Sequence, residues 1–132
     1  MKDGSVLIRD NKILEVTNCD LAVIGAELID VKGMYVVPGG VEIHVHGGGG
    51  RDFMECTEDA FRAAVHTHMK HGTTSIFPTL SSSTVPMIQQ AAETCTKLME
   101  EKNSPILGLH LEGHYLNMKM AGGQIPENIK KS

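Results

Sequence analysis

The chain has 132 residues and a formal net charge of −4, with 41% hydrophobic and 21% charged residues. This composition is typical of a globular domain. The net negative charge and the lack of a Lys and Arg cluster argue against a nucleic-acid partner. The charged start and the absence of any apolar run near the roughly 20 residues that span a bilayer argue against a signal peptide and a membrane span. Three widely spaced cysteines predict no disulfide framework, so we expect a cytoplasmic protein.

Residues 6–9 and 12–16 are rich in β-formers and flank Asp10-Asn11, which predicts a hairpin. Two more short extended pieces are expected within residues 26–40. Pro38 and the two glycines after it then interrupt the chain. We therefore place a small β-module at residues 1–37 and a second domain at residues 38–132.

The second part alternates strands and helices. Strands are predicted at residues 41–46, 73–80 and 105–113, and helices at residues 57–72 and 81–103. Thr57 is the expected N-cap of the first helix, and Pro86 falls in the first turn of the second, where it removes no helical donor. Successive βαβ units predict an α/β fold with a parallel sheet.

Two pairs of potential metal ligands lie at strand ends. His44 and His46 are two residues apart on a strand and so share one face, and His110 and Glu112 do so on the third strand. In a (β/α) barrel the C-terminal strand ends carry the functional groups. Two imidazoles and a carboxylate suit a divalent metal such as zinc. Residues 47–50, four glycines, would let the backbone approach that metal or an anion.

Each of these patterns also has a simpler interpretation. A His-x-His pair occurs on solvated strands, and a single Glu112 is often solvated or caps a helix. His66, His68 and His71 do not share one clean face of their helix, so we expect solvated or dipole-compensating roles for them. The position of His44 and His46 between a turn and a glycine loop nevertheless favours metal binding.

Several motifs resemble one family. VVPGGVEIHVHG, residues 36–47, resembles the first barrel strand of the amidohydrolase superfamily, with Glu42 where aspartate is usual. GLHLEGHYLN, residues 108–117, resembles the third-strand motif of N-acetylglucosamine-6-phosphate deacetylases, with His114 in place of proline. Residues 71–80 are similar to that family's second strand, and residues 5–40 to its small β-sandwich domain.

The resemblance implies a fold and a set of roles. The fold would be the first three strands of a metal-dependent (β/α)₈ TIM barrel preceded by part of a β-sandwich. His44, His46 and Glu112 would be metal ligands, with zinc favoured and iron(II) also suited to them. Gly123 and Gln124 would contact the substrate, with Gln124 where histidine is usual.

The implied reaction is metal-dependent hydrolysis of the N-acetyl group of N-acetylglucosamine 6-phosphate, by a cytoplasmic homodimer. The resemblance places the catalytic acid and two further histidine ligands beyond Ser132. A complete barrel needs about 250 residues. We therefore expect the 132-residue chain to correspond to an N-terminal portion that is inactive alone.

Two alternatives stay open. One is another amide hydrolase of the superfamily, such as a dihydroorotase-like enzyme, which would carry a modified lysine on the fourth strand. The other is a non-catalytic module that binds metal weakly or completes another subunit.

Overall fold

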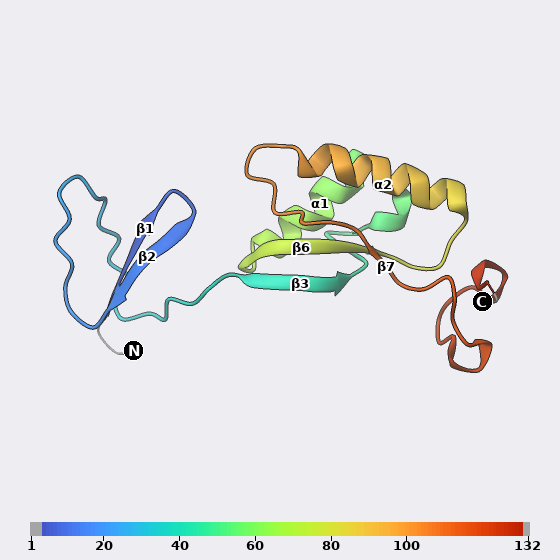
Figure 1. Cartoon of the computed structure of the whole chain (residues 1–132), viewed down its shortest axis with the longest axis horizontal. Coiled ribbons are helices and arrows are strands. Elements are labelled where there is room, and N and C mark those ends of the chain that lie inside the picture. Colours follow the sequence, from blue (N-terminus) through green and yellow to red (C-terminus); the bar gives the residue numbers. More distant parts are fainter. Residues whose placement is uncertain (1–3, 131–132) are drawn as a thin grey trace. The chain divides into compact units, whose positions relative to one another are not determined.

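The computed structural model describes residues 4–130, and the chain separates into two compact units. One unit ends at Pro38 and the other begins at Gly39 (Figure 1). No helix within residues 4–130 is both long enough and apolar enough to cross a lipid bilayer.

The first unit contains a β-hairpin. Strands β1 (Ser5–Arg9) and β2 (Lys12–Thr17) pair antiparallel. Asp10 in the turn has a φ of 58°, a left-handed conformation that aspartate tolerates better than most residues. The predicted hairpin is confirmed, and the pairing contains one irregularity between Leu7 and Ile8.

The two short strands predicted within residues 26–40 are not formed, and the next strand begins only at Gly40. Residues 18–39 contain turns and irregular backbone, and no strand is described there. Leu28 and Ile29 are 88% and 74% exposed. A β-rich segment becomes a strand only where a partner strand satisfies its backbone groups. Residues 18–39 have no such partner among the described residues, and the local sequence pattern could not show this.

The second unit is built on a three-stranded parallel sheet. Strands β3 (Gly40–Val45), β6 (Thr73–Leu80) and β7 (His110–Leu111) lie in the order β3-β6-β7 (Figure 1). The parallel α/β arrangement predicted from the sequence is confirmed. The C-terminal ends of the three strands therefore meet at one edge of the sheet.

Two helices cover one side of this sheet (Figure 1). They are α1 (Glu58–Met69) and α2 (Val85–Met99). As predicted, Thr57 caps α1, its hydroxyl accepting from the Ala60 N–H at 3.3 Å, and Pro86 lies in the first turn of α2. Gly72 follows α1 with a φ of 94°, a conformation that glycine adopts without strain.

The four glycines form a tight hairpin after β3. Strand β4 (Gly47–Gly48) pairs with β5 (Arg51–Asp52), which leads into the 3₁₀ helix η1 (Phe53–Glu55). A Cβ on Gly47 would lie 2.2 Å from the Arg51 carbonyl oxygen, and one on Gly49 would lie 2.5 Å from the Thr67 hydroxyl. The absence of side chains at Gly47 and Gly49 thus allows close packing against β5 and α1, a role that the sequence analysis did not predict.

The third strand is shorter than predicted. Only His110 and Leu111 form β7, and Ile106 makes an isolated parallel bridge with Ile76. His110 pairs with Thr79, so four steps along the third strand match three along β6. One extra residue therefore interrupts the regular pairing that the sequence pattern predicted. Two 3₁₀ turns follow, η2 (Met118–Met120) and η3 (Pro126–Asn128).

The core lies between the helices and the sheet. Phe53 and Phe61 are fully buried, with ring centroids 4.9 Å apart in an edge-to-face contact. Ile76 and Leu80 of β6 pack into the same cluster. Burial of these side chains fixes β6 against both helices and so fixes the position of the strand ends.

The three cysteines predict a simple test of this core. Burial raises the pKa of the Cys95 thiol to about 11 and also raises the pKa of Cys56, whereas Cys19 is exposed. Because the thiolate is the reactive form, we expect iodoacetamide at pH 8 to label Cys19 first and the other two only after unfolding in urea. Peptide mass spectrometry measures this order. Equal labelling of all three cysteines in the folded chain would contradict the burial of Cys56 and Cys95 in the core.

Candidate metal centre

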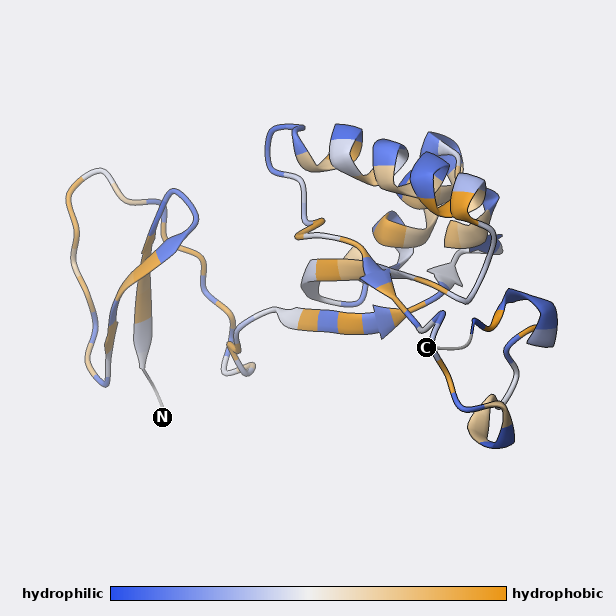
Figure 2. Ribbon diagram, turned by 45° about the vertical axis from the view of Figure 1, so that its right-hand side comes forward, coloured by the Kyte–Doolittle hydropathy of each residue, from blue (hydrophilic) through white to orange (hydrophobic). Residues whose placement is uncertain are grey.

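Three potential metal ligands meet at the sheet edge. His44 Nε2 lies 3.1 Å from His46 Nε2, and Glu112 Oε2 lies 3.1 Å from His46 Nε2 and 3.7 Å from His44 Nε2. One ligand atom from each residue lies within 4.8 Å of the other two. The sequence pattern predicted this grouping from the alternation along β3, which Figure 2 shows as alternating hydrophilic and hydrophobic residues.

The donor set and its spacing fit a divalent metal such as zinc. Four ligands at zinc–ligand distances near 2.0–2.1 Å in a tetrahedron place neighbouring donor atoms about 3.3 Å apart. The three observed separations, 3.1, 3.1 and 3.7 Å, bracket that value. The side chains of His44, His46 and Glu112 are 49%, 38% and 34% exposed. The group is thus open to an ion and to further ligands.

Backbone pairing brings Glu112 to the histidines. The Glu112 N–H donates to the Leu80 carbonyl at 2.8 Å, continuing the β6–β7 pairing one residue beyond the strand. The Glu112 backbone is therefore paired with the last residue of β6, which lies between β3 and β7 in the sheet. The Glu112 carboxylate also supplies the only negative charge in the group, which attracts a divalent cation.

A buried threonine ties the strand ends together. Thr79 of β6 is fully buried, and its hydroxyl accepts from the Val45 N–H at 2.9 Å. The same hydroxyl lies 3.1 Å from His110 Nδ1. The His110 ring in turn packs edge-on against His44, with centroids 5.1 Å apart. His110 thus supports His44 rather than joining the ligand group, and sequence reasoning missed Thr79 altogether.

Gln124 and His114 contact the loop after β6. Gln124 Oε1 accepts from the Ser82 N–H at 2.8 Å and from the Ser82 hydroxyl at 2.7 Å. His114 Nε2 lies 2.9 Å from the Ser83 carbonyl oxygen. Neither side chain belongs to the metal-ligand group, and Gly123 lies in a turn beside Gln124.

His68 also has a definite partner. Its Nε2 lies 2.9 Å from the Gly47 carbonyl oxygen, so this histidine fastens α1 to the glycine hairpin. This contact adds a structural partner to the solvated or dipole-compensating role expected for His68 in the last turn of α1. The local sequence pattern did not predict this partner, because Gly47 is 21 residues away in sequence.

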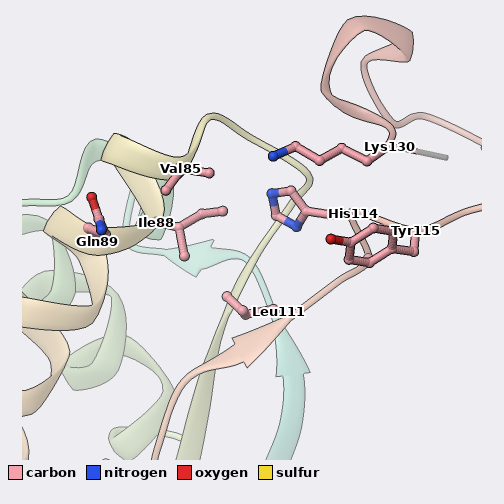
Figure 3. A pocket seen from close by; sticks show the side chains of 8 residues that line it. Val85, Ile88, Gln89, Leu111, His114, Tyr115 and Lys130 are labelled. Atoms are coloured by element: carbon pink, nitrogen blue, oxygen red, sulfur yellow. The ribbon is translucent and has the colours of Figure 1, made fainter. Parts of the chain in front are cut away.

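The second unit also contains a cavity of about 480 Å³. Figure 3 shows it between the start of α2 and the segment after β7, with Ile88 and Leu111 on its apolar side and His114, Tyr115 and Lys130 on the other. His44, His46 and Glu112 do not line it.

Residues 35–132 match the amidohydrolase family, and the chain belongs to that family. An N-acetylglucosamine-6-phosphate deacetylase from Bacillus subtilis is 32% identical over 138 residues, which cover 100% of this chain and 35% of the relative. An N-acetylgalactosamine-6-phosphate deacetylase from a Shewanella species is 28% identical over 96 residues, covering 72% of this chain and 24% of that protein.

The fold also matches a solved structure. The crystal structure of N-acetylglucosamine-6-phosphate deacetylase from Pasteurella multocida matches 98% of this chain with a TM-score of 0.89 and 24% identity. At that identity the likeness shows the fold. The match covers 35% of that structure's chain, so this chain spans about a third of its length.

Proposed function

We propose that the chain carries part of the active site of an enzyme that hydrolyses the N-acetyl group of N-acetylglucosamine 6-phosphate to glucosamine 6-phosphate and acetate. The observation that carries this proposal is the meeting of His44, His46 and Glu112 at the strand ends. The family match and the named activity of the Bacillus subtilis relative support it.

The residues have separate roles in the proposed site. His44, His46 and Glu112 would hold a divalent metal, with zinc favoured and iron(II) the alternative. Such a metal lowers the pKa of water and polarises an amide carbonyl. Gly123 and Gln124 would contact the sugar. Since the Gln124 carbonyl oxygen accepts two bonds from Ser82, its Nε2 amide is the part that would donate to a hydroxyl.

The proposed architecture is the beginning of a (β/α)₈ barrel at residues 38–132, after part of a β-sandwich at residues 1–37. On β3, Val41 and Ile43 are 58% and 69% exposed, although Val45 on the same face packs against the core. An exposed apolar edge strand is expected to be covered by further structure. A cytoplasmic homodimer and a catalytic acid supplied from outside these 132 residues complete the proposal.

Acetate release tests this function. We expect no turnover of N-acetylglucosamine 6-phosphate by the 132-residue chain with zinc or iron(II). We expect turnover by a chimera in which the chain replaces the matching part of the Bacillus subtilis relative. Circular dichroism and bound-metal analysis establish that the chimera is folded and loaded. A folded, loaded chimera without activity on acetylated hexosamine phosphates would contradict the proposal.

The sugar needs its own comparison. The Shewanella relative is named for the galactosamine epimer, so both N-acetylhexosamine 6-phosphates belong in the assay. Because the epimers differ in the orientation of one hydroxyl, a site that hydrogen-bonds this hydroxyl in one orientation discriminates between them. If the chimera prefers the galactosamine epimer, the proposed deacetylation stands, but the proposed substrate becomes N-acetylgalactosamine 6-phosphate.

A further inference from the structure

The serine loop, residues 81–83, joins β6 to α2 and is held by three side chains from the C-terminal segment. Gln124 accepts from Ser82, Asn128 Nδ2 donates to the Ser82 carbonyl at 3.1 Å, and His114 contacts the Ser83 carbonyl. Ser82 and Ser83 are 2% and 4% exposed. The loop's backbone is therefore fixed by side-chain hydrogen bonds rather than by a strand or helix.

From this fixed loop, Ser81 reaches a metal-ligand candidate. Its hydroxyl oxygen lies 3.4 Å from His46 Nδ1. The other ring nitrogen, His46 Nε2, faces His44 and Glu112. For Nε2 to offer its lone pair to a metal, a neutral imidazole must carry its hydrogen on Nδ1. The Ser81 hydroxyl is placed to accept that hydrogen.

We propose that Ser81 is a positioning residue that holds His46 in its metal-binding tautomer and orientation. His114, Gln124 and Asn128 act as its anchor, because they fix the loop from which Ser81 projects. The inference rests on the metal site of the proposed function and deepens it. It gives Gln124 a second task and assigns a role to His114, since both hold the loop from which Ser81 reaches His46.

The Ser81–His46 geometry also indicates how much the loss of the Ser81 hydroxyl should weaken metal binding. Partners of the second ring nitrogen of a metal-binding histidine typically change metal affinity by about 10–100-fold when removed. The 3.4 Å separation is longer than the roughly 2.7–3.2 Å of most N–H···O hydrogen bonds, so the contact is a weak one. We therefore expect loss of the Ser81 hydroxyl to weaken zinc binding by about 10-fold, the lower end of that range.

Zinc affinity of the 132-residue chain, measured by competition with a chromophoric chelator, tests the role. Ser81→Ala and Ser81→Val should bind zinc about 10-fold more weakly. Ser81→Thr, which has the shape of valine but keeps the hydroxyl, should bind like the unaltered chain. Ser83→Ala is the matched control, because the Ser83 hydroxyl points to Met87 Sδ at 3.1 Å. Circular dichroism verifies the folding of each variant.

A second readout identifies the tautomer directly. In the zinc-loaded chain, nitrogen-15 spectra should show His46 with its hydrogen on Nδ1 and zinc on Nε2. In Ser81→Ala that hydrogen should exchange with water faster. Zinc on Nδ1 of His46, unchanged affinity in Ser81→Ala, or an equal loss in Ser83→Ala would overturn the proposal.

The outcomes separate this inference from the proposed function. An unaltered chain that binds neither zinc nor iron(II) would overturn the metal site and this inference together. Zinc binding that depends on Ser81, combined with an inactive chimera, would overturn the deacetylase proposal and support the positioning role.

Discussion

Glu112→Gln is expected to weaken zinc binding by at least about 100-fold, more than the loss of a residue that only supports a ligand. The substitution keeps the size of the side chain but removes the only negative charge of the ligand group. The Glu112 backbone bond to Leu80 is retained, and the side chain is 34% exposed, so the fold should be preserved. Chelator competition measures the affinity, and thermal denaturation without metal checks the fold.

Exposed Glu93 on α2 provides the control. Glu93→Gln makes the same chemical change away from the strand ends and should leave zinc affinity unaltered. His44→Ala and His46→Ala should each weaken binding as Glu112→Gln does, because each removes one of three ligands. Equal affinity of Glu112→Gln and the unaltered chain would mean that the carboxylate is not a ligand. The histidine pair alone would then have to account for any zinc bound.

Local patterns predicted the elements that carry the ligands. The bounds of β6 agree with the predicted strand, and α2 starts at Val85 beside its expected first-turn proline. Two-residue spacing placed His44 and His46 on one face of β3. Glu112 could be added because parallel strands of successive βαβ units place their C-terminal ends at one edge.

The support around the ligands could not be predicted in this way. Ser82 and Gln124 are 42 residues apart, and Ser81 and His46 are 35 residues apart. Serines after a strand are typical of a loop or a helix start, and nothing local says which hydroxyl turns toward a histidine. The extra residue before β7 could not be predicted from the local sequence either, because it depends on how the third strand pairs with β6. Tertiary contacts therefore decide the details that tune the site.

Phe61→Ala is expected to lower the free energy of unfolding of the second unit by about 3–5 kcal/mol, the cost of deleting a buried aromatic side chain. Phe61 is fully buried on α1 and packs against Phe53 and the cluster that contains Ile76 and Leu80. The chain has no tryptophan, so urea unfolding followed by far-ultraviolet circular dichroism is the suitable measurement. Met99→Ala, at a side chain that is 39% exposed, should cost much less.

The same variant tests whether the metal site depends on the core. Leu80 packs in the Phe61 cluster, and its carbonyl holds the Glu112 backbone. Ser81, the next residue, is the proposed support of His46. If core packing fixes the end of β6, Phe61→Ala should weaken zinc binding even under conditions where the chain stays folded, and saturating zinc should recover part of the lost stability. Full zinc affinity in a folded but destabilised Phe61→Ala chain would mean that the backbone bonds of β6 and β7 position the ligands without the core.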